Sequence, residues 1–189
     1  MSHLDTLAVS REVVLAVFSI AAIAGCLLVV LSAATWFAPR LAFWPPPQVD
    51  SWQYRTFWWL FRVLVLGVVM SSFLDFGGLG RPLPLQRVVG TALAAMGFGL
   101  AFWATHELGW RDAHGEANAL KTTGWFGWSR NPIYVVSIVG MAGLGLLAHS
   151  AYVYTLLALW ATMYLVAPFL EEPWLELRYG DHSGCTRLK

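Results

Sequence analysis

The longest uncharged stretch, residues 131–170, restricts the possible folds more than any other feature of the sequence. It holds forty consecutive residues without Asp, Glu, Lys or Arg. A helix crosses a bilayer with about 20 apolar residues, so this stretch is long enough for two crossings. A single long helix would leave much of its apolar surface in water, at a cost of roughly 25 cal/mol per Å². His149 and Ser150 lie near the middle, and we therefore predict a helical hairpin with spans at 132–148 and 151–170.

Three further apolar segments precede the hairpin. Residues 13–37 form a run of 25 residues without a charge, and residues 88–105 form a run of 18. The segment 57–74 reaches the length of a span only with Arg62 included, whose long side chain can extend to the lipid headgroups. The sequence therefore predicts an all-α, polytopic membrane protein with about five transmembrane helices in a single domain, residues 1–189.

Prolines mark the connection between the first two spans. Pro39 and the triplet Pro45–Pro47 disfavour helix, and we expect a stiff, extended segment there. The apolar run before it is longer than the h-region of a signal peptide, so we interpret it as a retained first span.

The composition supports a membrane protein and argues against several partners. The chain is 58% hydrophobic and only 12% charged, whereas soluble domains carry about 25% charged residues. A net charge of +1 and the lack of a basic run predict no nucleic-acid partner. The histidines lack the spacing of metal ligands, so we expect no metal, and Cys26 and Cys185 are expected to be free thiols.

The basic residues are distributed unevenly between the two ends of the predicted spans. Five spans place eight of them on one side, namely Arg40, Arg55, Arg111, Lys121, Arg130, Arg178, Arg187 and Lys189. Only Arg11, Arg81 and Arg87 fall on the other side. Because cytosolic loops carry an excess of Lys and Arg, segments 106–131 and 171–189 are predicted to be cytosolic. We expect a bacterial inner (plasma) membrane protein with its N-terminus outside.

The hairpin is followed directly by an acid pair, Glu171 and Glu172. A charge at the centre of a spanning helix costs about 2.5–3.5 kcal/mol, so the pair is expected at the membrane interface or in a polar site. It is either an ordinary helix end that meets water or part of a binding site. Acids at a helix C-terminus oppose the helix dipole, which favours a compensating cation nearby. Arg130 is the nearest one if the hairpin closes, and Arg178 lies farther along the tail.

The hairpin begins with Arg130, Asn131 and Pro132, of which Asn131 suits an N-cap and Pro132 suits a first helical turn. Tyr134 suits a membrane-interface aromatic. These simple roles do not explain the preceding segment "KTTGWFGWS", residues 121–129, where two glycines alternate with aromatic residues. Such a loop lets a ligand approach the backbone while rings pack against it.

Together, "KTTGWFGWSRNPIYV" and, after one hairpin, "FLEEPWLELRYG" resemble the superfamily of isoprenylcysteine carboxyl methyltransferases and phospholipid methyltransferases. These are integral membrane enzymes that use S-adenosylmethionine. The resemblance covers about the last 70 residues. The positions that fit the family pattern are Gly124, Phe126, Arg130, Asn131, Pro132, Tyr134, Glu171, Glu172, Leu175, Tyr179 and Gly180.

The resemblance implies methyl transfer from S-adenosylmethionine to a membrane-embedded lipophilic acceptor, either an isoprenylcysteine-type carboxylate or a lipid amine. It implies catalytic roles for Arg130, Glu171 and Glu172. It implies cofactor binding by Gly124, Phe126, Arg130, Asn131, Pro132, Tyr134, Glu171 and Glu172. A carboxylate can accept from the cofactor's ammonium group or ribose diol, and an arginine can bind its carboxylate in a bidentate pair. Aromatic faces suit a sulfonium cation. If the acceptor must lose a proton, Glu171 or Glu172 is the expected base.

Two alternatives remain at this point. Membrane sterol-type reductases share a related C-terminal hairpin and use NADPH, although this chain is short for that class and lacks an evident site for the extra phosphate. A non-catalytic, lipid-binding membrane scaffold is the second alternative, because Ser183 and Thr186 stand where relatives have tyrosines. The small residues of "GMAGLGLL", residues 140–147, allow close helix packing either within one chain or between two, so the oligomeric state stays open.

Overall fold

The computed structural model describes residues 3–48, 50–108 and 132–179, and the described part is helical, without strands. The elements are α1 (His3–Phe37), the short 3₁₀ helix η1 (Pro39–Leu41), α2 (Trp52–Leu74), α3 (Pro84–Leu108), α5 (Pro132–Ala148) and α6 (Ala151–Tyr179). In the described part, four helices are long and apolar enough to cross a membrane, and α5 is a shorter apolar helix of 17 residues. The predicted class, an all-α polytopic membrane protein, is confirmed.

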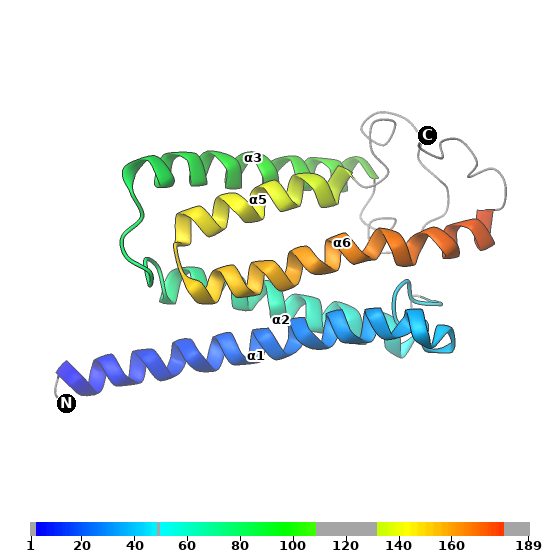
Figure 1. Ribbon diagram of the computed structural model, residues 1–189, viewed down its shortest axis with the longest axis horizontal. Coiled ribbons are helices and arrows are strands. Elements are labelled where there is room, and N and C mark those ends of the chain that lie inside the picture. The colour runs from blue at the N-terminus through cyan, green and yellow to red at the C-terminus, as the bar shows by residue number, and fades with distance from the viewer. Residues whose placement is uncertain (1–2, 49, 109–131, 180–189) are drawn as a thin grey trace.

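The axes of the long helices lie roughly parallel to one another (Figure 1). α1 and α6 run in the same direction. Phe18 of α1 packs against Tyr152 at the start of α6, with ring centroids 4.7 Å apart, and farther along both helices Gly25 faces Leu159. α2 and α5 run the opposite way. The core between α1, α2 and α6 contains completely buried side chains such as Leu28 and Leu156. Many large apolar side chains are exposed on the outer faces, as expected for surfaces that contact lipid tails.

α3 packs on α5 through glycines that let the two backbones approach closely. A Cβ atom added at Gly97 would lie 2.2 Å from the backbone nitrogen of Gly140. One added at Gly143 would lie 2.3 Å from the backbone nitrogen of Ala94. The small residues of segment 140–147 therefore serve a helix contact within the chain, as small residues often do in membranes.

The predicted hairpin is confirmed. α5 ends at Ala148 and α6 begins at Ala151, with His149 in the left-handed region at φ 45°. The turn docks on the connection between α2 and α3, where the backbone N–H of Gly77 donates to the carbonyl of Ala148 at 2.8 Å. The hydroxyl of Ser150, which is completely buried, donates to the carboxylate of Asp75 at the C-cap of α2. These bonds tie the two connections at this end of the bundle together.

We predict that Ser150→Ala destabilises the protein by about 1–3 kcal/mol, because the half-buried Asp75 carboxylate loses its donor. The hydroxyl also accepts from the backbone N–H of Val153 at 3.3 Å, so the cap of α6 is lost as well. The measurement is thermal unfolding in detergent. Ser72→Ala is the matched control, since among the described residues its hydroxyl bonds only to the carbonyl of Val68 within the same helix. Equal unfolding temperatures for the two variants would contradict a stabilising role of the hydrogen bond between Ser150 and Asp75.

The connection between α1 and α2 differs from the extended segment expected from its prolines. Pro39–Leu41 forms a 3₁₀ turn, and Ala42 adopts a left-handed conformation at φ 41°. The chain then turns back onto the bundle, and Phe43 and Trp44 become buried in the core. The expectation was wrong here because proline restricts its own backbone but does not decide whether neighbouring aromatic residues pack on the core.

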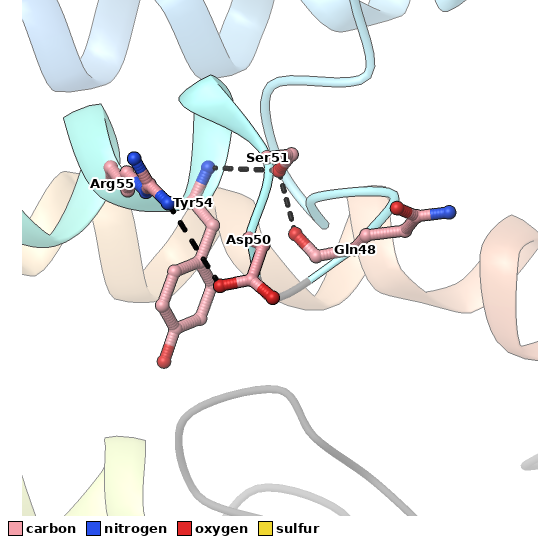
Figure 2. Close-up of polar contacts among 5 residues, drawn as sticks. All are labelled: Gln48, Asp50, Ser51, Tyr54 and Arg55. Carbon is pink, nitrogen blue, oxygen red and sulfur yellow. Dashed lines mark hydrogen bonds and ion pairs between the residues drawn. The ribbon is translucent and has the colours of Figure 1, made fainter.

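The C-terminal end of this connection is hydrogen-bonded to the start of α2 (Figure 2). The hydroxyl of Ser51 accepts from the backbone N–H of Tyr54 at 3.2 Å and donates to the carbonyl of Gln48 at 2.6 Å. Ser51 is thus the N-cap of α2. The ion pair between Asp50 and Arg55, 4.0 Å apart, is exposed to solvent and contributes little.

The acid pair does not lie at a helix end. α6 continues past Glu171 and Glu172 to Tyr179, with Pro173 inside the helix. The alternative of an ordinary helix end at the acid pair was therefore wrong, whereas the predicted span 151–170 lies within the apolar part of α6. Loss of apolar character marks where a helix meets a polar surrounding, but it does not stop the backbone from continuing as a helix.

Candidate functional site

The start of α5, the later part of α6 and the connection between α1 and α2 meet at one carboxylate, that of Glu171. Its Oε1 atom accepts from the hydroxyl of Tyr134 at 2.9 Å. The same atom accepts from the indole N–H of Trp44 at 3.0 Å. Tyr134 lies 37 residues from Glu171 in the sequence and Trp44 lies 127 residues away, so the contact depends on the tertiary fold.

Aromatic stacking holds both donors in place. The ring of Tyr134 stacks on Tyr164 of α6, with centroids 4.6 Å apart and an interplanar angle of 25°. The ring of Trp44 stacks on Phe57 of α2, with centroids 4.0 Å apart and an angle of 23°. The two donors of the carboxylate are therefore each held by an aromatic ring from another element, Phe57 of α2 and Tyr164 of α6.

The two donors at Glu171 use only part of the hydrogen-bond acceptor capacity of its carboxylate. Among the residues that the structure describes, both of its hydrogen-bond partners are neutral and both bind Oε1. A carboxylate has about four acceptor positions over its two oxygens, so Oε2 can still accept from a ligand. Charge-assisted bonds of this kind, to an ammonium group for example, are the stronger ones. The arrangement suits a small cationic or hydroxyl-bearing ligand.

Comparison with known proteins identifies the family. The family model described as phospholipid methyltransferase matches residues 85–182, more than half of the chain. The chain belongs to the phospholipid methyltransferase family. Membership implies that it is a membrane methyltransferase. A search of curated proteins and a search of solved structures each found no match.

The matched region of this phospholipid methyltransferase family member includes α3, α5 and α6. It therefore contains Tyr134 and Glu171, which belong to the two separate motifs of the resemblance. The structure brings these two residues together. Tyr134 is half-buried and bonded within the chain, so it does more than face the membrane interface. Trp44 and Phe57 lie outside the matched region.

Only some of the other predicted site residues lie in the part of the chain that the structure describes. Pro132 is buried and begins α5. Glu172 follows Glu171 in α6, but its side chain lies outside the described part, as does that of Arg178. The predicted residues Gly124, Phe126, Arg130 and Asn131 also lie outside it. The predicted pairing of Glu171 with a cation thus stays a prediction.

Two residues at this site were not predicted from the sequence. Tyr164 lies seven residues before Glu171, about two helical turns, so helical spacing places it on the same face and could have indicated it. Trp44 carries no such signal. It precedes a proline triplet in a connection far from the hairpin, and only the three-dimensional fold pairs it with Glu171.

Proposed function

We propose that this family member transfers a methyl group from S-adenosylmethionine to a lipophilic acceptor dissolved in the membrane. The single observation that carries the proposal is the hydrogen bond between Tyr134 and Glu171. It joins the entry and the exit of the hairpin, the two motifs on which the resemblance depends. The family match favours this function over a sterol-type reductase or a scaffold.

The residues at the site fit the chemistry of this cofactor. Glu171, with Oε2 open, would accept from the cofactor's ammonium group or ribose diol. The faces of Tyr134 and Tyr164 suit a positively charged sulfur nearby. Arg130 would bind the cofactor's carboxylate, and Gly124, Phe126, Asn131, Pro132 and Glu172 would complete the site as the resemblance implies.

When bound, S-adenosylmethionine supplies a methyl group that forms a bond to the acceptor's nucleophilic atom, while the bonding electron pair stays on the sulfur. The protein's main task is then alignment, which can lower a barrier by roughly 7–11 kcal/mol. A carboxylate acceptor needs no base. An amine acceptor must lose a proton, and we assign that role to Glu171 or Glu172.

The proposed orientation places the site at the cytosolic face of a bacterial inner membrane. The short helix η1, which contains Arg40, and the start of α2, which contains Arg55, lie at the end of the bundle that holds the site. The start of α3, with Arg81 just before it and Arg87 in its first turn, lies at the opposite end. The excess of basic residues predicted for the first end favours the cytosol there. The reactive head of the acceptor would reach this interface while its tail stays among the lipids.

The experiment is methyl transfer from labelled S-adenosylmethionine into a total lipid extract, with the purified chain in detergent. We expect one labelled lipophilic product, whose chemistry identifies the acceptor as a carboxylate or an amine. Addition of S-adenosylhomocysteine, the product of the cofactor, should suppress the labelling. The lipid extract is prepared from membranes of the organism that makes the protein. Labelling no greater than that obtained with heat-treated protein would favour the non-catalytic scaffold.

A further inference from the structure

Trp44 is held rigidly although it lies in a connection between helices. It is 8% exposed, and its ring stacks on Phe57 at 4.0 Å. Its neighbour Phe43 is completely buried, and the backbone N–H of Phe43 donates to the hydroxyl of Thr35 at 3.1 Å. On the other side, Gln53 at the start of α2 donates from its amide to the carbonyl of Leu41 at 3.2 Å. The direction of the indole N–H is therefore fixed by the surrounding chain.

This N–H and the hydroxyl of Tyr134 both bind Oε1 of Glu171, at 3.0 Å and 2.9 Å. The two donors come from different elements, so together they restrict the rotation of a flexible carboxylate more than either does alone. A glutamate without them would sample several rotamers and would have to be ordered when a ligand binds. Holding a group in its binding geometry before the ligand arrives strengthens binding by removing that cost.

We propose that Trp44 is a positioning residue, which holds Glu171 so that Oε2 faces the cofactor. The proposal rests on the proposed function, in which Glu171 binds S-adenosylmethionine. It extends the site to the connection between α1 and α2, which lies outside the region 85–182 that matches the family. The N-terminal half of the chain then contributes to cofactor affinity and not only to membrane insertion.

Trp44→Phe tests the proposal by removing the N–H while keeping an aromatic ring against Phe57. We expect the dissociation constant of S-adenosylmethionine to rise about tenfold, since the freed Glu171 side chain must then be ordered when the cofactor binds. The turnover rate at saturating cofactor should stay within about twofold, because positioning for binding is affected and the transfer step is not. Binding is measured by calorimetry on the chain in lipid nanodiscs.

Trp160→Phe is the matched control. Trp160 is 9% exposed and belongs to the same aromatic core, but the hydrogen-bond partners of Glu171 in the described part of the chain are Trp44 and Tyr134 and not Trp160. The same change of side chain there should leave cofactor affinity within about twofold of wild type. An equal loss of affinity in both variants would overturn the proposal, since it would reflect packing of the core.

A second substitution separates the N–H from the ring. At position 44, β-(3-benzothienyl)alanine has the shape of tryptophan with sulfur in place of the N–H, so folding should be preserved. We expect the same roughly tenfold loss of affinity as in Trp44→Phe, because Glu171 is again no longer held before the cofactor binds. Wild-type affinity with this residue would overturn the proposal.

A double-mutant cycle with Glu171→Ala shows whether Trp44 acts through Glu171. Trp44→Phe should weaken binding in the wild-type background and have no further effect once Glu171 is replaced. An equal effect in both backgrounds would overturn the positioning role while leaving the proposed function intact. If the wild-type chain does not bind S-adenosylmethionine, the proposed function fails and this inference fails with it.

Discussion

Glu171→Gln is expected to weaken S-adenosylmethionine binding by about tenfold to a hundredfold and to lower the methyl transfer rate at subsaturating cofactor in proportion. A charge-assisted hydrogen bond contributes about 1.5–3 kcal/mol, and every 1.4 kcal/mol corresponds to a factor of ten. The glutamine has the same size, and its amide oxygen can still accept from Trp44 and Tyr134. The fold should therefore survive, and the lost affinity can be assigned to the charge. Calorimetry and a labelled-methyl assay provide the two readouts.

Asp50→Asn is the control for this prediction. It removes a carboxylate at the same end of the bundle, but Asp50 is almost fully exposed, with 96% of its side chain accessible, and lies 4.0 Å from Arg55. Its loss should change neither affinity nor rate by more than about twofold, since exposed ion pairs contribute little. If Glu171→Gln binds the cofactor as wild type does and remains folded, Glu171 is not a cofactor ligand.

Gly97→Ala is expected to have the largest effect on stability. The added methyl group would lie 2.2 Å from the backbone nitrogen of Gly140, and a backbone atom cannot move aside as a side chain can. α3 and α5 must then separate, which costs about 1–3 kcal/mol or more. Thermal unfolding in detergent should show a clear drop in unfolding temperature.

Gly99→Ala is the control for this change, two residues along the same helix. A Cβ atom there meets nothing within 4 Å. Alanine is favoured over glycine in a helix by about 1 kcal/mol, so Gly99→Ala should be neutral or slightly stabilising. If Gly97→Ala were as stable as Gly99→Ala, the close contact between α3 and α5 would be refuted. The contrast needs no knowledge of the ligand.

The sequence was sufficient for the parts of this fold that depend on local properties. Forty uncharged residues with a polar pair near the middle predicted the hairpin, and the length of a bilayer crossing placed its turn at His149 and Ser150. The hairpin in turn placed Tyr134 and Glu171 at the same end of the bundle. That they lie at the same end follows from chain geometry, whereas their hydrogen bond was not predicted, since the sequence paired Glu171 with Arg130.

Features that depend on tertiary packing could not be predicted in this way. The contact of Trp44 with Glu171 joins residues 127 positions apart, and no local pattern connects them. The burial of Phe43 and Trp44 is decided by the space between α1, α2 and α6 and not by the prolines that follow. The extension of α6 to Tyr179 was missed because polarity was taken as the end of the helix.

Equilibrium binding of S-adenosylmethionine and of NADPH to the wild-type chain in nanodiscs tests the central claim most directly. The central claim is that the closed hairpin, with Tyr134 and Glu171 in contact, forms a site for S-adenosylmethionine. It predicts saturable binding of one S-adenosylmethionine per chain, displaced by S-adenosylhomocysteine and unaffected by NADPH. Saturable binding of NADPH alone, or of neither compound, would contradict it.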